Sequence, residues 1–94
     1  MNNTLLSIGS VVLLKNSTKR VMIIGVLQKQ IVEEGEKLWD YSGCLYPEGY
    51  MGPDRTFLFD HDQIEKVFAI GYQDEEQIAF AEKINELREE MKNN

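Results

Sequence analysis

Apolar residues recur in short runs along the first 70 positions, and clusters of turn-forming residues separate these runs. Val11 to Leu14 are apolar at consecutive positions, which is typical of a strand covered on both faces. The cluster at 16–19 has the composition and length of a hairpin loop, so the apolar run that follows it should pair antiparallel with the first. The same pattern predicts strands at about residues 10–15, 20–28, 37–46, 55–59 and 67–70.

Gly25 lies in the middle of the second predicted strand. A glycine inside a strand has no side chain to pack and commonly marks a bulge or a sharp bend. We therefore expect an antiparallel sheet of about five strands that is curled and partly barrel-like. Asp60, followed three positions later by Gln63, should cap a short helix before the last strand.

A long charged helix is predicted to follow Tyr72. Asp74 and Gln77 repeat the capping spacing, so the helix should begin near Asp74. Its apolar residues recur in steps of four, three and four, which places them on one stripe. They are Phe80, Ile84, Leu87 and Met91. A helix of about 18 residues is roughly 27 Å long, so the stripe either packs fully on the sheet or leaves its distal end uncovered.

These elements predict an α+β fold. Ninety-four residues suffice for one modest hydrophobic core, so we expect a single domain over residues 1–94. Its sheet part should cover residues 1–72, and its amphipathic C-terminal helix should cover residues 73–94.

The charge of the chain is acidic and unevenly distributed. Residues 1–70 carry seven basic and nine acidic side chains, whereas residues 71–94 carry three basic and seven acidic ones. The net charge of −6 disfavours binding to nucleic acid or to an anionic membrane. One cysteine, no signal-peptide pattern and no apolar run of membrane-spanning length predict a cytoplasmic protein.

Few residues suggest catalysis. His61 between Asp60 and Asp62 could be a general base, but an aspartate at a helix start more often caps the helix. Cys44 lies in a predicted strand without a basic neighbour, which favours a buried inert thiol. One His and one Cys cannot build a structural zinc site, and no glycine-rich phosphate loop is present. We therefore expect no enzyme, no catalytic residue, no metal and no cofactor.

Aromatic residues cluster beside the loop at 47–54, which holds both prolines. Tyr and Trp dominate binding hot spots because they bury a large area at little rotamer entropy. An uncovered apolar helix stripe would also seek a protein partner or a second copy of the chain. The candidate partner-binding residues are Tyr46, Glu48, Tyr50, Met51, Leu87 and Met91.

Several segments resemble domain-of-unknown-function family 4176, over about residues 8–76. They are the opening 8–16, the strand 22–25, the block 40–49 and the later segments 59–64 and 67–72. The most specific is the order of Tyr, Gly, Cys, Leu, Tyr, Pro, Glu and Gly within the block 40–49, which ends at Gly49.

That resemblance implies a small protein of Gram-positive bacteria, often encoded in type VII secretion loci beside toxins with an LXG domain. It implies a non-catalytic accessory role, such as a cytoplasmic chaperone or adaptor that binds the toxin. An immunity-type or regulatory binding protein is the alternative, and a thiol-dependent enzyme using Cys44 is a more distant one.

Overall fold

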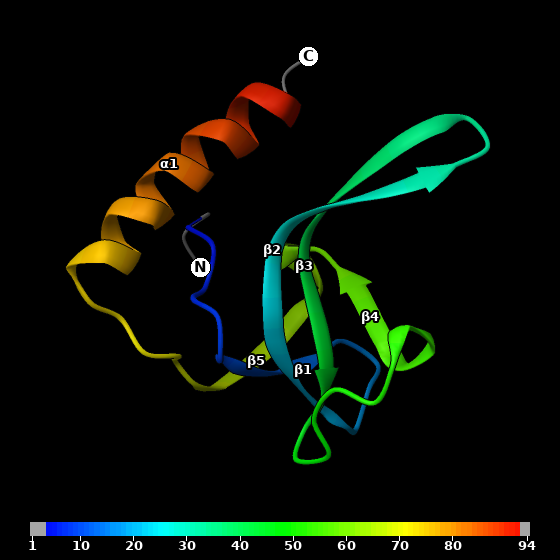
Figure 1. The fold of residues 1–94 in the computed structure, drawn as a ribbon. Coiled ribbons are helices and arrows are strands. Elements are labelled where there is room, and N and C mark those ends of the chain that lie inside the picture. Colours follow the sequence, from blue (N-terminus) through cyan, green and yellow to red (C-terminus); the bar gives the residue numbers. More distant parts are fainter. Residues whose placement is uncertain (1–3, 93–94) are drawn as a thin grey trace.

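The computed structural model describes residues 4–92 and shows an antiparallel sheet with one long helix beside it (Figure 1). The strand order is β4-β3-β2-β1-β5, and every pair of neighbours is antiparallel. The strands are β1 (Val11–Leu14), β2 (Arg20–Val32), β3 (Gly35–Leu45), β4 (Thr56–Phe59) and β5 (Ile64–Ala69). The helices are the 3-10 turns η1 (Pro53–Arg55) and η2 (His61–Gln63) and the α-helix α1 (Glu75–Lys92).

The sheet is open, so the expectation of a curled, partly barrel-like sheet is wrong. β4 and β5 form its two edges and do not pair with each other. The strand lengths explain this, because β2 and β3 have 13 and 11 residues but β1, β4 and β5 have only 4, 4 and 6. Closure requires tilted strands of matched length and stagger. Here the long β2–β3 hairpin projects beyond its neighbours instead (Figure 1).

The predicted irregularity at Gly25 is confirmed. The pairing of β2 with β3 shifts register between Ile23 and Gly25, which is a bulge. A Cβ atom on Gly25 would overlap the side-chain hydroxyl of Ser42 on the neighbouring strand. The bulge therefore redirects the hairpin locally without closing the sheet.

Both predicted capping pairs are found in the structure. The side-chain oxygen of Gln63 accepts a hydrogen bond from the backbone N–H of Asp60 at 2.8 Å, at the start of η2. The carboxylate of Asp74 accepts from the backbone N–H of Gln77 at 2.8 Å, directly before α1. The short helix and the start of the long helix are thus placed correctly by the sequence, although η2 is a single 3-10 turn.

The N-terminal segment before β1 is part of the core, which the sequence pattern did not predict. The segment runs between α1 and β2 (Figure 1), and the buried Leu5 joins the central apolar cluster. The other buried members of that cluster are Val12, Val21, Ile23, Tyr41, Phe59 and Ile64. Gly71 binds the segment through hydrogen bonds with the hydroxyls of Ser7 and Ser10, both at 3.0 Å. A Cβ atom on Gly71 would collide with the carbonyl of Ile8, so this close approach requires glycine.

α1 rests on this core by a narrow strip. Of its predicted apolar stripe, Ile84 packs against the core cluster. Phe80, Leu87 and Met91 remain 52%, 40% and 36% exposed, so much of the stripe is uncovered. The last two positions of the predicted helical part, 93 and 94, lie outside the described residues.

Gly25→Val should lower the free energy of unfolding by about 1–3 kcal/mol, because the branched side chain must displace Ser42 or distort the bulge. The measurement is a urea unfolding midpoint by circular dichroism. Ile31→Val on the exposed end of the same strand is the control and should stay within about 0.5 kcal/mol of wild type. An unchanged midpoint for Gly25→Val would show that the bulge does not require glycine.

Candidate functional site

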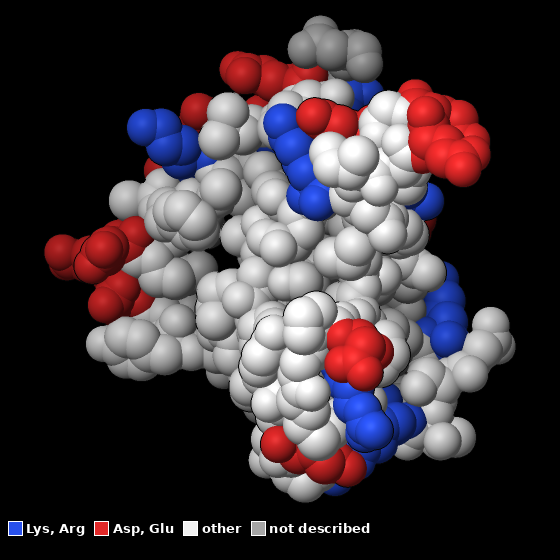
Figure 2. Space-filling model, turned by 45° about the vertical axis from the view of Figure 1, so that its right-hand side comes forward, with Lys and Arg blue, Asp and Glu red and all other residues white. Residues whose placement is uncertain are grey.

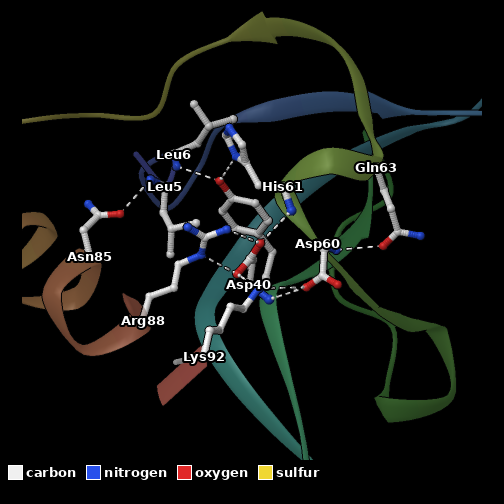
Figure 3. A network of polar contacts seen from close by, with 10 residues as sticks. Leu5, Leu6, Asp40, Asp60, His61, Gln63, Asn85, Arg88 and Lys92 are labelled. Atoms are coloured by element: carbon white, nitrogen blue, oxygen red, sulfur yellow. Dashed lines mark hydrogen bonds and ion pairs between the residues drawn. The ribbon is translucent and has the colours of Figure 1, made fainter. Parts of the chain in front are cut away.

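A buried carboxylate on β3 is the polar centre of the structure. The side chain of Asp40 is 1% exposed. Arg88 of α1 donates to both of its oxygens, from Nε to Oδ1 at 2.7 Å and from Nη2 to Oδ2 at 3.1 Å. The Nζ of Lys92, one turn later on the helix, lies 3.0 Å from Oδ1. Figure 3 shows both basic side chains reaching from the helix to this single carboxylate.

The same carboxylate also binds the turn η2. Its Oδ2 accepts from the backbone N–H of His61 at 2.8 Å. In return, the Oδ1 of Asp60 accepts from the backbone N–H of Asp40 at 3.0 Å. Lys92 extends over both acidic residues and lies 4.0 Å from Asp60. Three separate parts of the chain, β3, η2 and α1, therefore meet at Asp40 (Figure 3).

A second buried contact lies beside the first. The hydroxyl of Tyr41 is 2.7 Å from the Nδ1 of His61 and accepts from the backbone N–H of Leu6 at 2.8 Å. Burial raises the pKa of Tyr41 to about 12, so the phenol keeps its proton at neutral pH. Since Leu6 already donates to this oxygen, the phenolic proton is available to Nδ1. This pair ties the N-terminal segment to η2.

Opposing effects act on the pKa of Asp40. Burial of the carboxyl raises it, but hydrogen bonds from Arg88, from the backbone of His61 and from Lys92 outweigh the burial. The pKa falls from 3.8 to about 2. That difference corresponds to about 2 kcal/mol of stability at neutral pH. Asp40 is therefore anionic at neutral pH and contributes to docking of the helix.

The chemistry of this cluster is that of an anchor. Both oxygens of Asp40 receive donors, and Nδ1 of His61 faces Tyr41. Over residues 4–92, no group of three or more His, Cys, Asp or Glu is arranged to hold a metal ion. A hollow of about 190 Å³ lies over the cluster, lined by Asp40, Asp60, His61, Asp62, Arg88 and Lys92.

Cys44 lies in the middle of the sheet. It is buried on β3, paired with Met22 of β2 on one side and Thr56 of β4 on the other. The prediction of a buried thiol is therefore confirmed. His61, the base considered for it, has its Nδ1 beside Tyr41 instead.

The candidate partner-binding residues near the loop fall into two kinds. Two of them make contacts within the chain: Arg20 lies over the ring of Tyr46 at 5.1 Å, and Lys19 pairs with Glu48 at 2.7 Å. The other two are exposed, and Tyr50, at 62%, presents the larger side chain to solvent.

Leu87 and Met91, the remaining candidates, lie far from that loop. The loop follows β3 at one end of the molecule, and the C-terminal half of α1 lies at the other (Figure 1). The structure therefore separates the six candidates into two surfaces. Whether either surface binds a partner stays a prediction.

Asp40 and Arg88 are the residues that sequence reasoning missed. A weak signal existed, because Asp40 is the only charged residue in the aromatic stretch 38–46. A lone charge in an otherwise buried strand needs a partner. Nothing in a sequence spacing of 48 positions identifies that partner as Arg88.

The fold and the anchor define a class of small α+β protein in which an open antiparallel sheet carries a C-terminal helix held by a buried ion pair. Over residues 4–92, none of the helices is long and apolar enough to cross a membrane. The family model described as Domain of unknown function (DUF4176) matches residues 5–80, and the chain belongs to that family. Neither a curated protein nor a solved structure matches the chain.

Arg88→Met should lower the free energy of unfolding at pH 7 by about 3 kcal/mol, because it leaves a buried carboxylate with fewer donors. Lys92 still contacts Asp40, so the loss should be near the lower end for a broken buried pair. Urea unfolding followed by circular dichroism measures it. Lys83→Met on the exposed face of the same helix is the control and should change stability little.

The loss should depend on pH. The folded-state pKa of Asp40 is depressed, so its contribution is fully present above about pH 4 and is lost as pH falls through about 2. Wild type and Arg88→Met should therefore converge in stability as the pH approaches 2. A difference that stays constant from pH 7 to pH 2 would show that the charge of Asp40 is not what Arg88 stabilises.

Cys44 should react with an aromatic disulfide reagent at least about 100-fold more slowly in the native protein than in urea, since access requires opening of the sheet. Absorbance of the released thiolate measures the rate. In a Cys44→Ser background, Thr18→Cys in the exposed first turn is the control and should react rapidly in both conditions. Rapid labelling of native Cys44 would restore the alternative of a reactive thiol.

Proposed function

We propose that this chain is a non-catalytic accessory protein that binds a protein partner through the uncovered apolar flank of α1. The flank is formed by Phe80, Leu87 and Met91, which recur on the helix and remain substantially exposed. Aromatic and aliphatic side chains exposed together on a helix are typical of a binding surface. This flank is the observation that carries the proposal.

The β2–β3 hairpin extends the same surface. Met91 lines a depression of about 300 Å³ together with Leu38 of β3, Lys29 of β2 and Glu36. The last two form an ion pair at 3.6 Å on the hairpin. Near the other end of the flank, Phe80 borders a small apolar hollow with Ile8 of the N-terminal segment. A partner on this flank would thus contact α1 and other elements together.

The distribution of charge supports a protein partner. Figure 2 shows acidic and basic side chains next to one another toward the two ends of this face, with a broad area of uncharged surface between them. Such an area suits apolar contact better than binding of a polyanion. The net charge of −6 adds to this preference, because it repels phosphate groups and anionic lipids.

The finer proposal concerns the partner. Family resemblance supports a chaperone or adaptor, acting in the cytoplasm, for a toxin with an LXG domain that a type VII system secretes. A chaperone should co-purify with the intact toxin and raise its soluble yield. An immunity protein, the alternative, should instead abolish the toxic activity when mixed with the purified toxin.

Leu87→Asp combined with Met91→Asp should weaken partner capture or self-association at least tenfold, because each new carboxylate would have to be desolvated in an apolar contact. The protein should remain folded. Both residues are more than one third exposed, so the unfolding free energy should fall by no more than about 2 kcal/mol, part of it from new negative charge near the helix C-terminus. The measurements are pull-down with a co-expressed LXG toxin, sedimentation and a circular-dichroism melt.

The control places the same two charges elsewhere. Ala79→Asp with Phe57→Asp changes two exposed apolar positions outside the flank and outside the β2–β3 hairpin, and it should leave capture unchanged. Unaltered capture by the Leu87 and Met91 variant would contradict the proposal and direct attention to the exposed Tyr50 and Met51. A large drop in melting temperature would show that the flank belongs to the core.

A further inference from the structure

The opposite flank of α1 borders a groove. This groove, of about 480 Å³, runs between the helix and the N-terminal segment. Leu5, Ile78 and Ala81 supply its apolar surface. Glu82, Glu86 and Glu89 supply an acidic wall along the helix.

The wall is acidic because the helix divides its charges. Two of its three basic residues, Arg88 and Lys92, reach toward Asp40 and Asp60, whose two carboxylates balance their charge. The third, Lys83, is not part of the groove lining. No basic side chain among the residues lining the groove offsets the three glutamates. The groove therefore presents uncompensated negative charge next to apolar surface.

The three glutamates also oppose one another. Glu82 and Glu86 are four positions apart, and Glu86 and Glu89 are three apart, so they are neighbours on the helix surface. Like charges at these spacings destabilise a helix. A bound cation would remove the repulsion, whereas the free protein retains it.

The N-terminal segment, which forms the other side of the groove, is tied to the helix. The side chain of Asn85 accepts from the backbone N–H of Leu5 at 3.1 Å and donates to the carbonyl of Ala81 at 2.7 Å. This bridge holds the N-terminal segment beside the helix. Gln77, which also lines the groove, has a buried Oε1 without a hydrogen-bond partner among the described residues.

We propose that this groove binds a basic amphipathic helix of the protein partner, with lysine or arginine residues against the acidic wall and aliphatic residues against Ile78 and Ala81. The part of α1 that lines the groove, from Gln77 to Glu89, spans about 18 Å at 1.5 Å per residue. This length matches about three turns of a partner helix. This inference rests on the proposed function, because it names the chemistry of one segment of the same partner.

The test uses a synthetic amphipathic peptide of about 14 residues, with lysines on one face and leucines on the other, titrated by fluorescence anisotropy. The full-length protein should bind it, and affinity should fall steeply as salt increases. Glu82→Gln, Glu86→Gln and Glu89→Gln together should reduce affinity at least tenfold. Because the repulsion is removed, this triple variant should melt at the same temperature as wild type or higher.

Two controls make the result specific. Glu33→Gln, Glu34→Gln and Glu90→Gln remove the same number of charges outside the groove and should keep most of the binding. A peptide with glutamate in place of lysine should not bind. Equal losses in both triple variants, or unchanged binding in the groove variant, would overturn the inference.

The same variants separate this inference from the proposed function. If the groove variant captures the LXG toxin as well as wild type does, the groove inference fails while the proposed function stands. If the wild-type protein binds the peptide through the groove but does not capture an LXG toxin, the groove inference stands and the proposed toxin partner is wrong.

Discussion

The buried ion pair between Asp40 and Arg88 is the interaction on which the arrangement of the molecule depends. None of the residues of α1 is fully buried, so apolar packing alone provides little to hold the helix. A carboxylate that is 1% exposed must be paired, and the helix supplies its pairing. The helix needs Asp40 to dock, and the sheet needs the helix to bury Asp40. Docking of the helix and folding of β3 are therefore coupled.

This constraint leaves both flanks of α1 available. The residues that face the sheet, Ile84, Arg88 and Lys92, form a narrow line between an apolar flank on one side and an acidic groove on the other. A helix embedded by a broad apolar face would have neither. Because an ion pair holds the helix in place of a wide apolar contact, much of the helix surface stays exposed.

The proposed partner would meet two chemically different flanks. Phe80, Leu87 and Met91 would bind an apolar surface, and the glutamates of the groove would bind a basic helix. Such a division favours specificity, since apolar burial contributes affinity while charge complementarity selects the partner and its orientation. The loop at 47–54, which holds the exposed Tyr50, lies at the far end of the sheet from the C-terminal half of α1.

The local elements could be predicted from the sequence because they depend on neighbours in the chain. The alternation of apolar runs and turns predicted five strands, although β2 extends four residues beyond its predicted end and β5 begins three residues early. The Asp74 and Gln77 spacing placed the start of α1. Gly25 indicated its own bulge for the same reason. The burial of Cys44 also followed from its position within a strand.

Contacts between distant segments were decided by the tertiary structure. The sheet is open because β2 and β3 are much longer than the strands beside them. The sequence of a single strand does not show this difference in length. Leu5 is held by a hydrogen bond to Asn85, 80 positions away, and Asp40 pairs with Arg88, 48 positions away. A local pattern shows that a buried charge or an apolar face needs a partner, but only the folded chain determines which residue meets that need.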